Sequence, residues 1–396
     1  MAKERIGIMG GTFNPIHSGH IAMARAALTG AKLDRVLFLP DGVPPHKTGI
    51  APAEDRWRML CAAISQEEQL EPCRIELDRA GTTYTIDTLS DLHRLYPKAD
   101  LFYIIGADTL MQLHSWRESE KVLRLCTFLV CPRTMTCSRE DYLAERKRLT
   151  SLGASLINID MDVMDVSSSD LREQLARGEA TPLLPVTVRE YCGAKGLYGM
   201  PRRVAQADEW MDRLFSDLTA KRFAHTLAVA YSARHLAMAH GEDIRKAEIA
   251  ALLHDCAKCL PLKDMRRMYE EHSTAVDDSV LESGNLLHSS AGACMASVVY
   301  GVTDPEILNA IASHTTGRAG MTRLDMIVYL ADKIEPTRAD YPVLTKVRMM
   351  STLSLEKALL TSMDSTAKYV RKGGKPLHPQ TLETIEWLKT LPENKA

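Results

Sequence analysis

The chain lacks three features that would place it in a specialised class of proteins. It has no excess of either charge, since 49 lysines and arginines stand against 51 aspartates and glutamates, so no basic field favours nucleic acid or an anionic membrane. No uncharged apolar run approaches the ~18 residues of a membrane-spanning helix. The nine cysteines form no framework, as is usual for reduced thiols in the cytosol. We therefore expect a cytoplasmic protein that binds neither nucleic acid nor membrane.

The first half of the chain has the pattern of a parallel α/β sheet. The 396 residues are 45% hydrophobic and 25% charged, which is typical of globular proteins built from domains of ~150 residues. Short apolar runs alternate with helical patterns, and this order predicts parallel strands covered by helices on both faces. The predicted strands are Arg5–Met9, Arg35–Pro40, Leu101–Ile105, Thr127–Cys131 and Ser155–Ile159, and the predicted helices are about His20–Leu28, Ala53–Ile64, Tyr84–Tyr96, Arg139–Leu149 and Leu171–Arg177.

The second half of the chain has no strand pattern. It begins after Gly199-Met200-Pro201-Arg202-Arg203, a glycine- and proline-containing stretch typical of a linker. The helical patterns that follow cover Trp210–Leu218, Arg222–Ala239, Ala247–Ala257, Ser289–Tyr300, Pro305–Ser313, Leu324–Ile334 and Leu353–Arg371. We therefore predict an α/β domain over residues 1–198, a linker over 199–206 and an all-α domain over 207–396.

The turn after the first predicted strand carries a motif suited to an anion. It reads Gly10-Gly11-Thr12-Phe13-Asn14-Pro15-Ile16-His17-Ser18-Gly19-His20. Paired glycines let the backbone approach a bulky anion and present N–H groups to it. His17 and His20 add two imidazoles at the start of a helix, where the macrodipole already favours negative charge. Because the third protein ligand of a catalytic zinc site is lacking, the motif predicts a polyphosphate site.

Further candidate residues follow the other predicted strands. Asp108, in Gly106-Ala107-Asp108, has the position of a carboxylate that binds a ribose hydroxyl. Lys47 ends the rigid loop Pro44-Pro45-His46-Lys47, as a phosphate contact or as an ordinary surface lysine. Trp116 offers an aromatic face to a heterocycle or to the core. Ser168 and Ser169 open a helix, where hydroxyls cap free N–H groups and phosphate can bind.

Together these motifs resemble those of bacterial nicotinate-nucleotide adenylyltransferases. Gly10–His20 is similar to the nucleotidyltransferase signature that ends in His/Thr-x-Gly-His. The later segments stand in the order of that family, which here is Pro44–Lys47, Tyr84–Leu89, Gly106–Asp108, His114–Trp116 and Ser167–Arg172. One departure is visible, because Val166-Ser167-Ser168-Ser169 replaces the usual Ile-Ser-Ser-Thr and keeps the hydroxyl. The resemblance covers about residues 3–198.

The resemblance implies an α/β nucleotidyltransferase fold with a Rossmann-like parallel sheet. It also implies transfer of AMP from ATP to nicotinate mononucleotide, with release of pyrophosphate and with Mg²⁺ shared by the phosphates. His17 and His20 would be the catalytic residues, and Thr85 and Trp116 would hold the nicotinate. The implied ATP-binding residues are Gly10, Gly11, Thr12, Phe13, Lys47, Gly106, Asp108, Arg133, Ser168 and Ser169. Adenylylation of another phosphate substrate, such as phosphopantetheine, stays open as an alternative.

Several histidines and aspartates of the helical half lie on the apolar faces of predicted helices, so their side chains should point into the helical bundle. The six candidates are His225, His254, Asp255, His288, His314 and Asp332. Burial of a carboxylate costs several kcal/mol unless it is paired or metal-bound. Four imidazoles and two carboxylates suit a pair of iron, manganese or zinc ions, and metal pairs are built for phosphoester or phosphoanhydride hydrolysis. Lys258, one turn after His254, is either a phosphate contact or a helix-end cation.

The helical half resembles the HD superfamily of metal phosphohydrolases, and within it the YqeK family. The segments that carry the resemblance are His225-Thr226-Leu227, His254–Lys258, His314–Arg318 and Ala331–Arg338, within about residues 207–390. The resemblance implies a di-iron centre on the six candidate ligands and symmetrical cleavage of diadenosine tetraphosphate into two ADP. Lys258, Arg318 and Arg338 are candidates for the tetraphosphate. We therefore expect a bifunctional enzyme. Another HD nucleotidase, or a metal-binding nucleotide sensor that regulates the first domain, remains an alternative for the second half.

Overall fold

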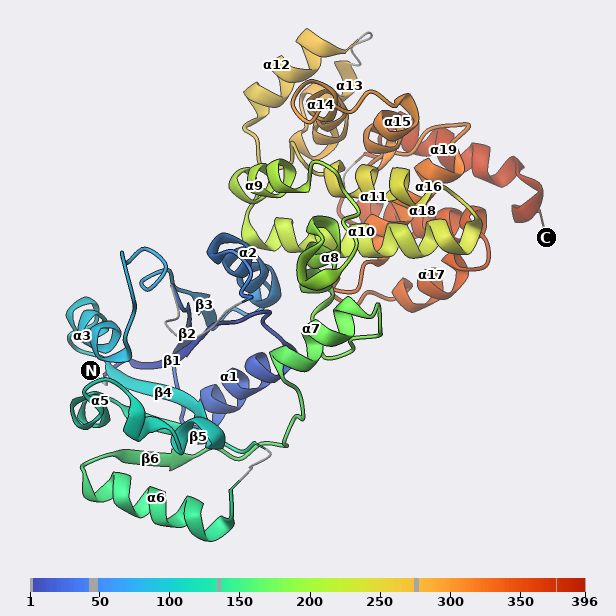
Figure 1. The fold of residues 1–396 in the computed structure, drawn as a ribbon. Helices are drawn as coiled ribbons and strands as arrows, with labels where there is room; N and C mark the ends of the chain where they lie inside the picture. Colours follow the sequence, from blue (N-terminus) through green and yellow to red (C-terminus); the bar gives the residue numbers. More distant parts are fainter. Residues whose placement is uncertain (1–2, 43–48, 134–136, 274–277, 375, 396) are drawn as a thin grey trace. The chain divides into compact units, whose positions relative to one another are not determined.

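The computed structural model of the chain describes residues 3–42, 49–133, 137–273, 278–374 and 376–395 (Figure 1). Contacts within the chain divide it into two compact units. The first contains Met1–Val188 and Leu197–Met200, and the second contains Arg189–Gly196 and Pro201–Ala396. No helix among the described residues is both long and apolar enough to cross a membrane.

The first unit is built on a sheet of six parallel strands in the order β3-β2-β1-β4-β5-β6. The strands are β1 (Arg5–Gly11), β2 (Arg35–Pro40), β3 (Leu70–Pro72), β4 (Asp100–Gly106), β5 (Thr127–Cys131) and β6 (Ser155–Asn158). The five strands predicted from apolar runs are confirmed. The sequence analysis missed β3, because three residues that include a proline leave no strand pattern at the sheet edge.

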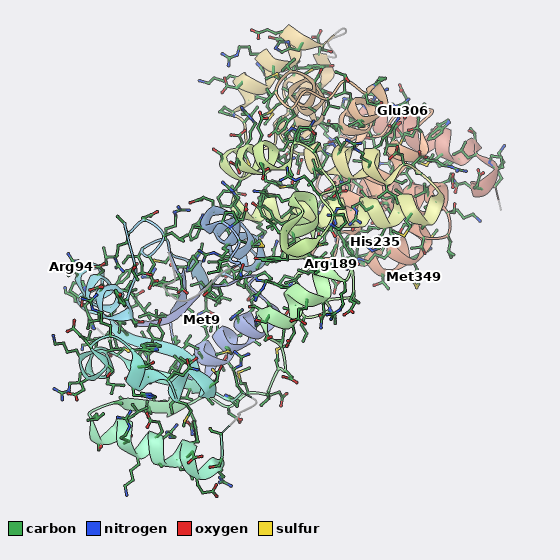
Figure 2. The ribbon with its side chains drawn as sticks, viewed as in Figure 1. Met9, Arg94, Arg189, His235, Glu306 and Met349 are labelled. Atoms are coloured by element: carbon green, nitrogen blue, oxygen red, sulfur yellow. The ribbon has the colours of Figure 1, made fainter. Side chains whose placement is uncertain are left out.

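Helices connect the strands of the first unit and cover the sheet. They are α1 (Ser18–Gly30), α2 (Ala53–Ile64), α3 (Thr85–Leu95), α4 (Ala107–Leu110), α5 (Ser119–Leu125), α6 (Arg139–Ser151) and α7 (Ser168–Ala176), with a 3-10 turn η1 (Leu113–Ser115). Met9 on β1 is buried in this unit, whereas Arg94 on α3 is exposed (Figure 2). The strand order reverses direction between β1 and β4, and ligands bind beyond the carboxyl ends of strands at such a point.

The second unit is all-helical among its described residues. Its elements are α8 (Val186–Lys195, from Arg189 on), α9 (Ala207–Asp217), α10 (Ala220–His240), α11 (Ile244–Leu253), α12 (Leu262–His272), α13 (Asp278–Leu281), α14 (Gly284–Val298), α15 (Pro305–Ser313), α16 (Arg323–Ile334), α17 (Leu344–Ser351), α18 (Leu355–Lys372), α19 (Pro379–Thr390) and the 3-10 turn η3 (Pro392–Asn394). The long helix α10 packs against α11 and α16, and α16 packs against α15 and α18. The predicted pairing of an α/β half with an all-helical half is confirmed.

Buried ion pairs explain why the end of α8 belongs to the second unit. Arg203 donates to Glu248 on α11 at 2.7 Å and to Glu190 on α8 at 2.6 Å. Arg234 on α10 also donates to Glu190, at 2.9 Å. Both carboxylates are less than 5% exposed. The unit boundary therefore differs from the expected end of the first domain at residue 198, since long-range charge pairing leaves no local signal in the sequence.

Loss of Arg203 is expected to destabilise the second unit. In the variant Arg203→Ala, Glu190 and Glu248 keep buried carboxylates that share only Arg234, and removal of one partner of a buried pair costs about 3–5 kcal/mol. Denaturant unfolding, followed by the transition of the helical unit, measures this loss. The neighbouring variant Arg202→Ala is the control, because its partner Asp208 is 60% exposed and such surface pairs contribute about 0–1 kcal/mol. Equal losses in the two variants would contradict the role of the buried cluster.

Candidate active sites

The loop from β1 to α1 brings the two motif histidines together. His17 is the N-cap of α1, and its backbone N–H donates to Nδ1 of His20 at 3.3 Å. The two imidazole rings stack with centroids 3.7 Å apart. Because Nδ1 of His20 accepts this bond, the ring proton of the neutral imidazole must sit on Nε2. His20 can therefore donate through Nε2 at the helix N-terminus, where an anion is favoured.

Both imidazoles are neutral near pH 7. Burial, assisted by the charge of Arg133, lowers the pKa of His17 to about 4. Burial also holds the pKa of His20 well below its usual value, with further contributions from His17 and Arg133. The two uncharged imidazoles lie beside the positive charge of Arg133, so the local charge favours a negatively charged ligand. An anion bound here would raise both pKa values and gain hydrogen bonds from the rings.

Two of the motif glycines are required by close contacts. A Cβ atom on Gly10 would lie 2.3 Å from the hydroxyl of Tyr103, and one on Gly106 would lie 2.3 Å from Oδ1 of Asp108. Both glycines stand at the carboxyl ends of neighbouring strands, β1 and β4. The side chains of Tyr103 and Asp108 can pack this close to the strand ends only because glycine has no Cβ atom.

A pocket opens at the carboxyl ends of β1 and β4. Its volume is about 140 Å³, and its lining includes Gly10, His20, Tyr103, Trp116 and Arg133. The Trp116 ring packs edge-on against Tyr103, with centroids 5.7 Å apart. The structure thus brings two of the predicted phosphate contacts, His20 and Arg133, into one cavity with the predicted aromatic face of Trp116.

Thr85 affects a residue that lines this pocket. It is the first residue of α3, and its side chain acts to lower the pKa of Tyr103 against the larger effect of burial. Burial raises the pKa of Tyr103, so this hydroxyl stays protonated. The sequence analysis named Thr85 and Trp116 but missed Tyr103, because a tyrosine inside a buried strand looks like an ordinary core residue.

The remaining predicted ATP-binding residues have different surroundings. Asp108 lies 3.9 Å from Arg133, which also donates to the carbonyl of Val166 at 3.0 Å. Ser168 donates to the carbonyl of Pro15 at 3.0 Å and so supports the β1–α1 loop. Ser169 accepts from Arg172 at 3.2 Å. Lys47 lies outside the described residues.

A buried arginine holds the β1–α1 loop from the side of α2. Arg56 is 1% exposed and donates to four backbone carbonyls, those of Thr12, Asp41, Gly42 and Ala51. Thr12 also donates its hydroxyl to Asp41 at 2.8 Å. The sequence analysis missed Arg56, since nothing in a helical pattern distinguishes a buried arginine from a solvated one. A guanidinium that satisfies four carbonyls makes the loop rigid before any ligand arrives.

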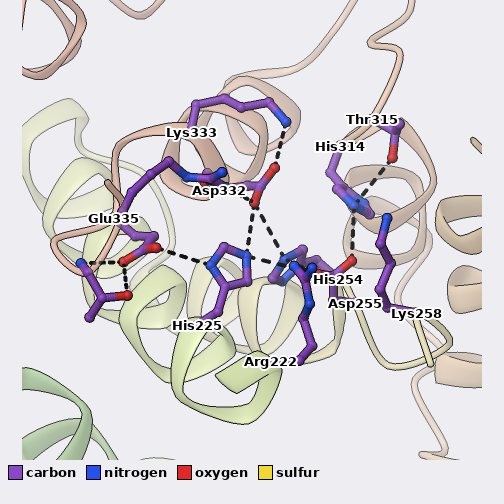
Figure 3. Close-up of polar contacts among 12 residues, drawn as sticks. Arg222, His225, His254, Asp255, Lys258, His314, Thr315, Asp332, Lys333 and Glu335 are labelled. Atoms are coloured by element: carbon purple, nitrogen blue, oxygen red, sulfur yellow. Dashed lines mark hydrogen bonds and ion pairs between the residues drawn. The ribbon is translucent and has the colours of Figure 1, made fainter. Parts of the chain in front are cut away.

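The six predicted metal ligands of the second unit converge in its core, and Figure 3 labels all of them except His288. His225 lies on α10, His288 on α14 and Asp332 on α16. His254 and His314 occupy the C-cap positions of α11 and α15, and Asp255 follows His254. None of the six is more than 7% exposed. Five segments that are distant in sequence therefore meet at one buried place, as predicted.

The ligand-type atoms of this cluster are close enough to share metal ions. Nε2 of His225 lies 3.0 Å from Oδ1 of Asp332, and Nε2 of His288 lies 3.2 Å from Oδ1 of Asp255. Two groups of three could each hold an ion, namely His225, His254 and Asp332, and His254, Asp255 and His314. Nε2 of His254, which belongs to both groups, is buried and makes no hydrogen bond within the described part of the chain. The residues present thus fit a metal centre of nitrogen and oxygen ligands.

The outer nitrogen of each histidine has an acceptor that orients its ring. Nδ1 of His254 donates to the carbonyl of Ala251 at 2.6 Å, and Nδ1 of His314 donates to that of Ile311 at 2.7 Å. Nδ1 of His288 lies 3.2 Å from the carbonyl of Gly284. These bonds turn each Nε2 inward in the form that ligates metals.

His225 differs, because its acceptor is a carboxylate. Nδ1 of His225 lies 3.1 Å from Oε1 of Glu335, whose other oxygen accepts from the hydroxyl of Thr337 at 2.7 Å. Glu335 is 2% exposed. A carboxylate behind a ligating imidazole orients it and makes it a stronger ligand. The sequence analysis missed this residue, although it stands three positions after Asp332 in the same motif.

The protonation states suit a site for cations. Burial by itself would raise the pKa of Asp255 and of Asp332, but the positive neighbours outweigh it and hold both values well below the usual range. Burial lowers the pKa of His314 to about 4. At His225 burial acts in the same direction, yet Asp332 and Glu335 outweigh it and raise the pKa. This corner of the cluster therefore favours a positive charge.

Cationic side chains surround the carboxylates of the cluster. Arg222 donates to Asp255 at 2.7 Å, Lys333 donates to Asp332 at 2.7 Å, and Arg338 donates to Asp332 at 2.9 Å. Lys258 lies 3.3 Å from Nδ1 of His288. Lys258 and Arg338 were predicted as tetraphosphate contacts, whereas Arg222 and Lys333 were missed.

Arg318, the third predicted tetraphosphate contact, is engaged elsewhere. It donates to Asp325 at 2.5 Å, and Asp325 is fully buried and caps the N-terminus of α16. This pairing supports the helix that carries Asp332. Its role at a substrate stays a prediction.

Comparisons with known proteins match each unit to a family. A cytidylyltransferase-like family model matches residues 8–174, and an HD domain model matches residues 222–337. The first match spans the glycine loop, the pocket and the start of α7. The second spans the six candidate metal ligands and Glu335.

One relative matches both units, and other relatives match a single unit. A protein of Mycoplasma genitalium described as a probable nicotinate-nucleotide adenylyltransferase/Ap4A hydrolase is 30% identical over 337 residues, which are 85% of this chain and 89% of that protein. A probable nicotinate-nucleotide adenylyltransferase of Corynebacterium kroppenstedtii is 38% identical over 212 residues, 52% of this chain and 96% of that protein. A crystal structure from Clostridium acetobutylicum, described as a predicted HD superfamily hydrolase involved in NAD metabolism, is 40% identical, with a TM-score of 0.44, and covers 46% of this chain and 95% of that one.

The sequence motifs, the two sites and these matches agree. The long relative spans both units, and its name joins the two family assignments that the separate models make. The chain therefore belongs to the nicotinate-nucleotide adenylyltransferase family, in the form in which that domain is joined to a C-terminal HD domain.

Proposed function

We propose that the first unit transfers AMP from ATP to nicotinate mononucleotide and releases pyrophosphate. The observation that carries this proposal is the pocket in which His20 and Arg133 share one cavity with Trp116. Side chains that can donate hydrogen bonds to phosphate, together with an aromatic face in the same cavity, suit a nucleotide next to a second heterocycle. The curated relatives bear that activity in their names.

In this proposal the protein positions the reactants and stabilises charge. The phosphates of ATP lie at the N-terminus of α1, where His20 donates from Nε2 and Arg133 supplies a positive charge. Asp108 accepts from the ribose, and Thr85 and Trp116 hold the nicotinate. Mg²⁺ enters with the ATP and neutralises part of the phosphate charge. The attack by the 5′-phosphate on the α-phosphorus needs no covalent intermediate on the protein, so alignment and charge stabilisation supply the acceleration.

Replacement of His20 should reduce adenylyl transfer without unfolding the protein. The variant His20→Ala removes a donor aimed at the developing charge, and loss of one such donor lowers kcat by about 10²–10³-fold. Pyrophosphate release with ATP and nicotinate mononucleotide measures the rate. His235→Ala, which changes an exposed residue of α10, is the matched control and should keep the wild-type rate. Trials with phosphopantetheine as the acceptor test the alternative substrate.

We propose that the second unit hydrolyses diadenosine tetraphosphate symmetrically to two ADP at a pair of metal ions. The observation that carries this proposal is the convergence of three histidines and two aspartates in two overlapping groups of three, with a fourth histidine, His288, 3.2 Å from Asp255. The relative from Mycoplasma genitalium bears the name Ap4A hydrolase. Iron is the metal implied by the resemblance to the YqeK family, and the donor set also suits manganese or zinc.

The residues around the cluster have separate roles in this proposal. The six ligands would hold the ions, which when bound supply Lewis acidity and an activated water to phosphoanhydride cleavage. Lys258 and Arg338, with Arg222 and Lys333, bring positive charge to the rim where the tetraphosphate would lie. The carbonyls and Glu335 behind the histidines keep the rings turned inward.

The two activities should be separable by substitution. Asp332→Asn removes the carboxylate of the group formed with His225 and His254, and we expect it to abolish hydrolysis of diadenosine tetraphosphate while dinucleotide synthesis continues, whereas His20→Ala should do the reverse. Chromatography identifies the products, and two ADP rather than AMP with ATP indicates symmetrical cleavage. A chelator should stop the hydrolysis. If the metal-loaded wild type cleaves other nucleotides only, it is another HD nucleotidase, and no turnover of any nucleotide favours the sensor.

Glu335 should determine how tightly the centre holds its metal. Glu335→Gln keeps the shape of the side chain and removes the charge behind His225, and loss of such a partner lowers metal affinity by about 10–100-fold. Competition with a chelator and elemental analysis measure the affinity and the stoichiometry. Glu306→Gln, on the exposed first turn of α15, is the control. Identical metal retention in both variants would show that Glu335 has no such role.

A further inference from the structure

Tyr198 has an unusual backbone conformation that its side chain explains. It lies in the 3-10 turn η2 (Leu197–Gly199) with φ 56° and ψ 37°, in the left-handed region that residues with a Cβ rarely adopt. Gly196 and Gly199 on either side also have positive φ, and there glycine removes the strain. Tyrosine at the middle position therefore needs a reason in its side chain.

The side chain of Tyr198 makes a hydrogen bond inside the glycine motif. Its hydroxyl donates to Oδ1 of Asn14 at 2.8 Å, and the same oxygen accepts from the backbone N–H of Ala51 at 3.0 Å. The second bond fixes the orientation of the amide, because a backbone N–H only donates. Asn14 is 6% exposed, so the bond lies away from bulk water.

Asn14 stands at the centre of the loop that carries the two histidines. The backbone carbonyl of Asn14 accepts from Arg172 at 2.8 Å. Two residues earlier, the backbone carbonyl of Thr12 accepts from Arg56 at 2.9 Å. Tyr198 also contributes to the electrostatic surroundings of Arg56. The hydroxyl of Tyr198 is thus one of the groups that hold the loop between Gly10 and His17 in place.

The segment that supplies this hydroxyl is the connection between the two units. Leu197–Met200 belongs to the first unit, whereas the residues on both sides belong to the second. Within the second unit the two sides are joined, since the backbone N–H of Arg203 donates to the carbonyl of Gly193 at 3.1 Å. The side chain of Arg202 also donates to the carbonyl of Lys195 at 3.2 Å. The loop that carries Tyr198 is closed at its base.

We propose that Tyr198 is a positioning residue for ATP, which acts through Asn14 to keep the β1–α1 loop in its phosphate-binding conformation. It touches no substrate, and it lies outside the residues matched by the cytidylyltransferase-like model. The connection between the units then completes the nucleotide site of the first one. This proposal rests on the proposed adenylyl transfer.

The test is Tyr198→Phe in the full chain, which removes only the hydroxyl. The KM for ATP should rise about 5-fold, the effect of one neutral hydrogen bond, while the KM for nicotinate mononucleotide and the melting temperature stay close to wild type. Tyr142→Phe is the matched control, because that hydroxyl also makes a side-chain hydrogen bond, which it accepts from Arg146 at 3.4 Å, but lies on α6. It should change neither constant. An unchanged KM for ATP, or equal rises for both substrates, would overturn the proposal.

A double-mutant cycle tests whether the effect passes through Asn14. In the background of Asn14→Ala, the further change Tyr198→Phe should have no additional effect on ATP binding, measured by calorimetry, whereas additive effects would refute the route through Asn14. The turnover of the wild-type protein distinguishes a failure of the proposed role of Tyr198 from a failure of the proposed adenylyl transfer. If the wild type makes no dinucleotide, adenylyl transfer itself fails. If it does and Tyr198→Phe matches it, only the role of Tyr198 fails.

Discussion

Two ionised carboxylates in the core of the helical unit constrain everything around them. Asp255 and Asp332 are buried, and burial of a charge costs several kcal/mol unless opposite charges or metal ions compensate it. The unit meets this requirement with four imidazoles and a rim of cations. Each helix that carries one of these groups must therefore keep its position. The packing of α10, α11, α15 and α16 serves the site as much as the core.

The candidate site of the first unit consists of hydrogen-bond donors instead of buried carboxylates. Its site collects donors, and burial together with the charge of Arg133 lowers the pKa values of His17 and His20. An anionic ligand would raise both pKa values and accept hydrogen bonds from the rings. Main-chain contacts hold the β1–α1 loop, because Arg56 joins the carbonyl of Thr12 in this loop to three carbonyls between β2 and α2, and Ser168 donates to the carbonyl of Pro15. One chain thus contains one group of residues suited to an anion and another suited to cations.

Local patterns predicted the elements that carry strong signals. Continuous apolar runs indicated the five longer strands, and polar residues on apolar faces indicated the six ligands, which do converge. Where a role depends on a distant partner, local patterns failed. Arg318 was a candidate for the substrate phosphates or for a salt bridge, and only the structure shows that it pairs with buried Asp325. Glu335 stood inside a recognised motif, yet only its distance to His225 shows what it does.

The sequence by itself determined the two halves, their fold classes, and the residue types of both sites, because periodicity and motif spacing are properties of neighbouring residues. Only the tertiary structure decided which groups face one another. It joined residues 189–196 to the helical unit through Glu190 and Arg203, and it placed the hydroxyl of Tyr198 on Asn14. Such pairs are 13 and 184 positions apart, and charge or hydrogen-bond complementarity at that separation arises only when packing brings the chain together.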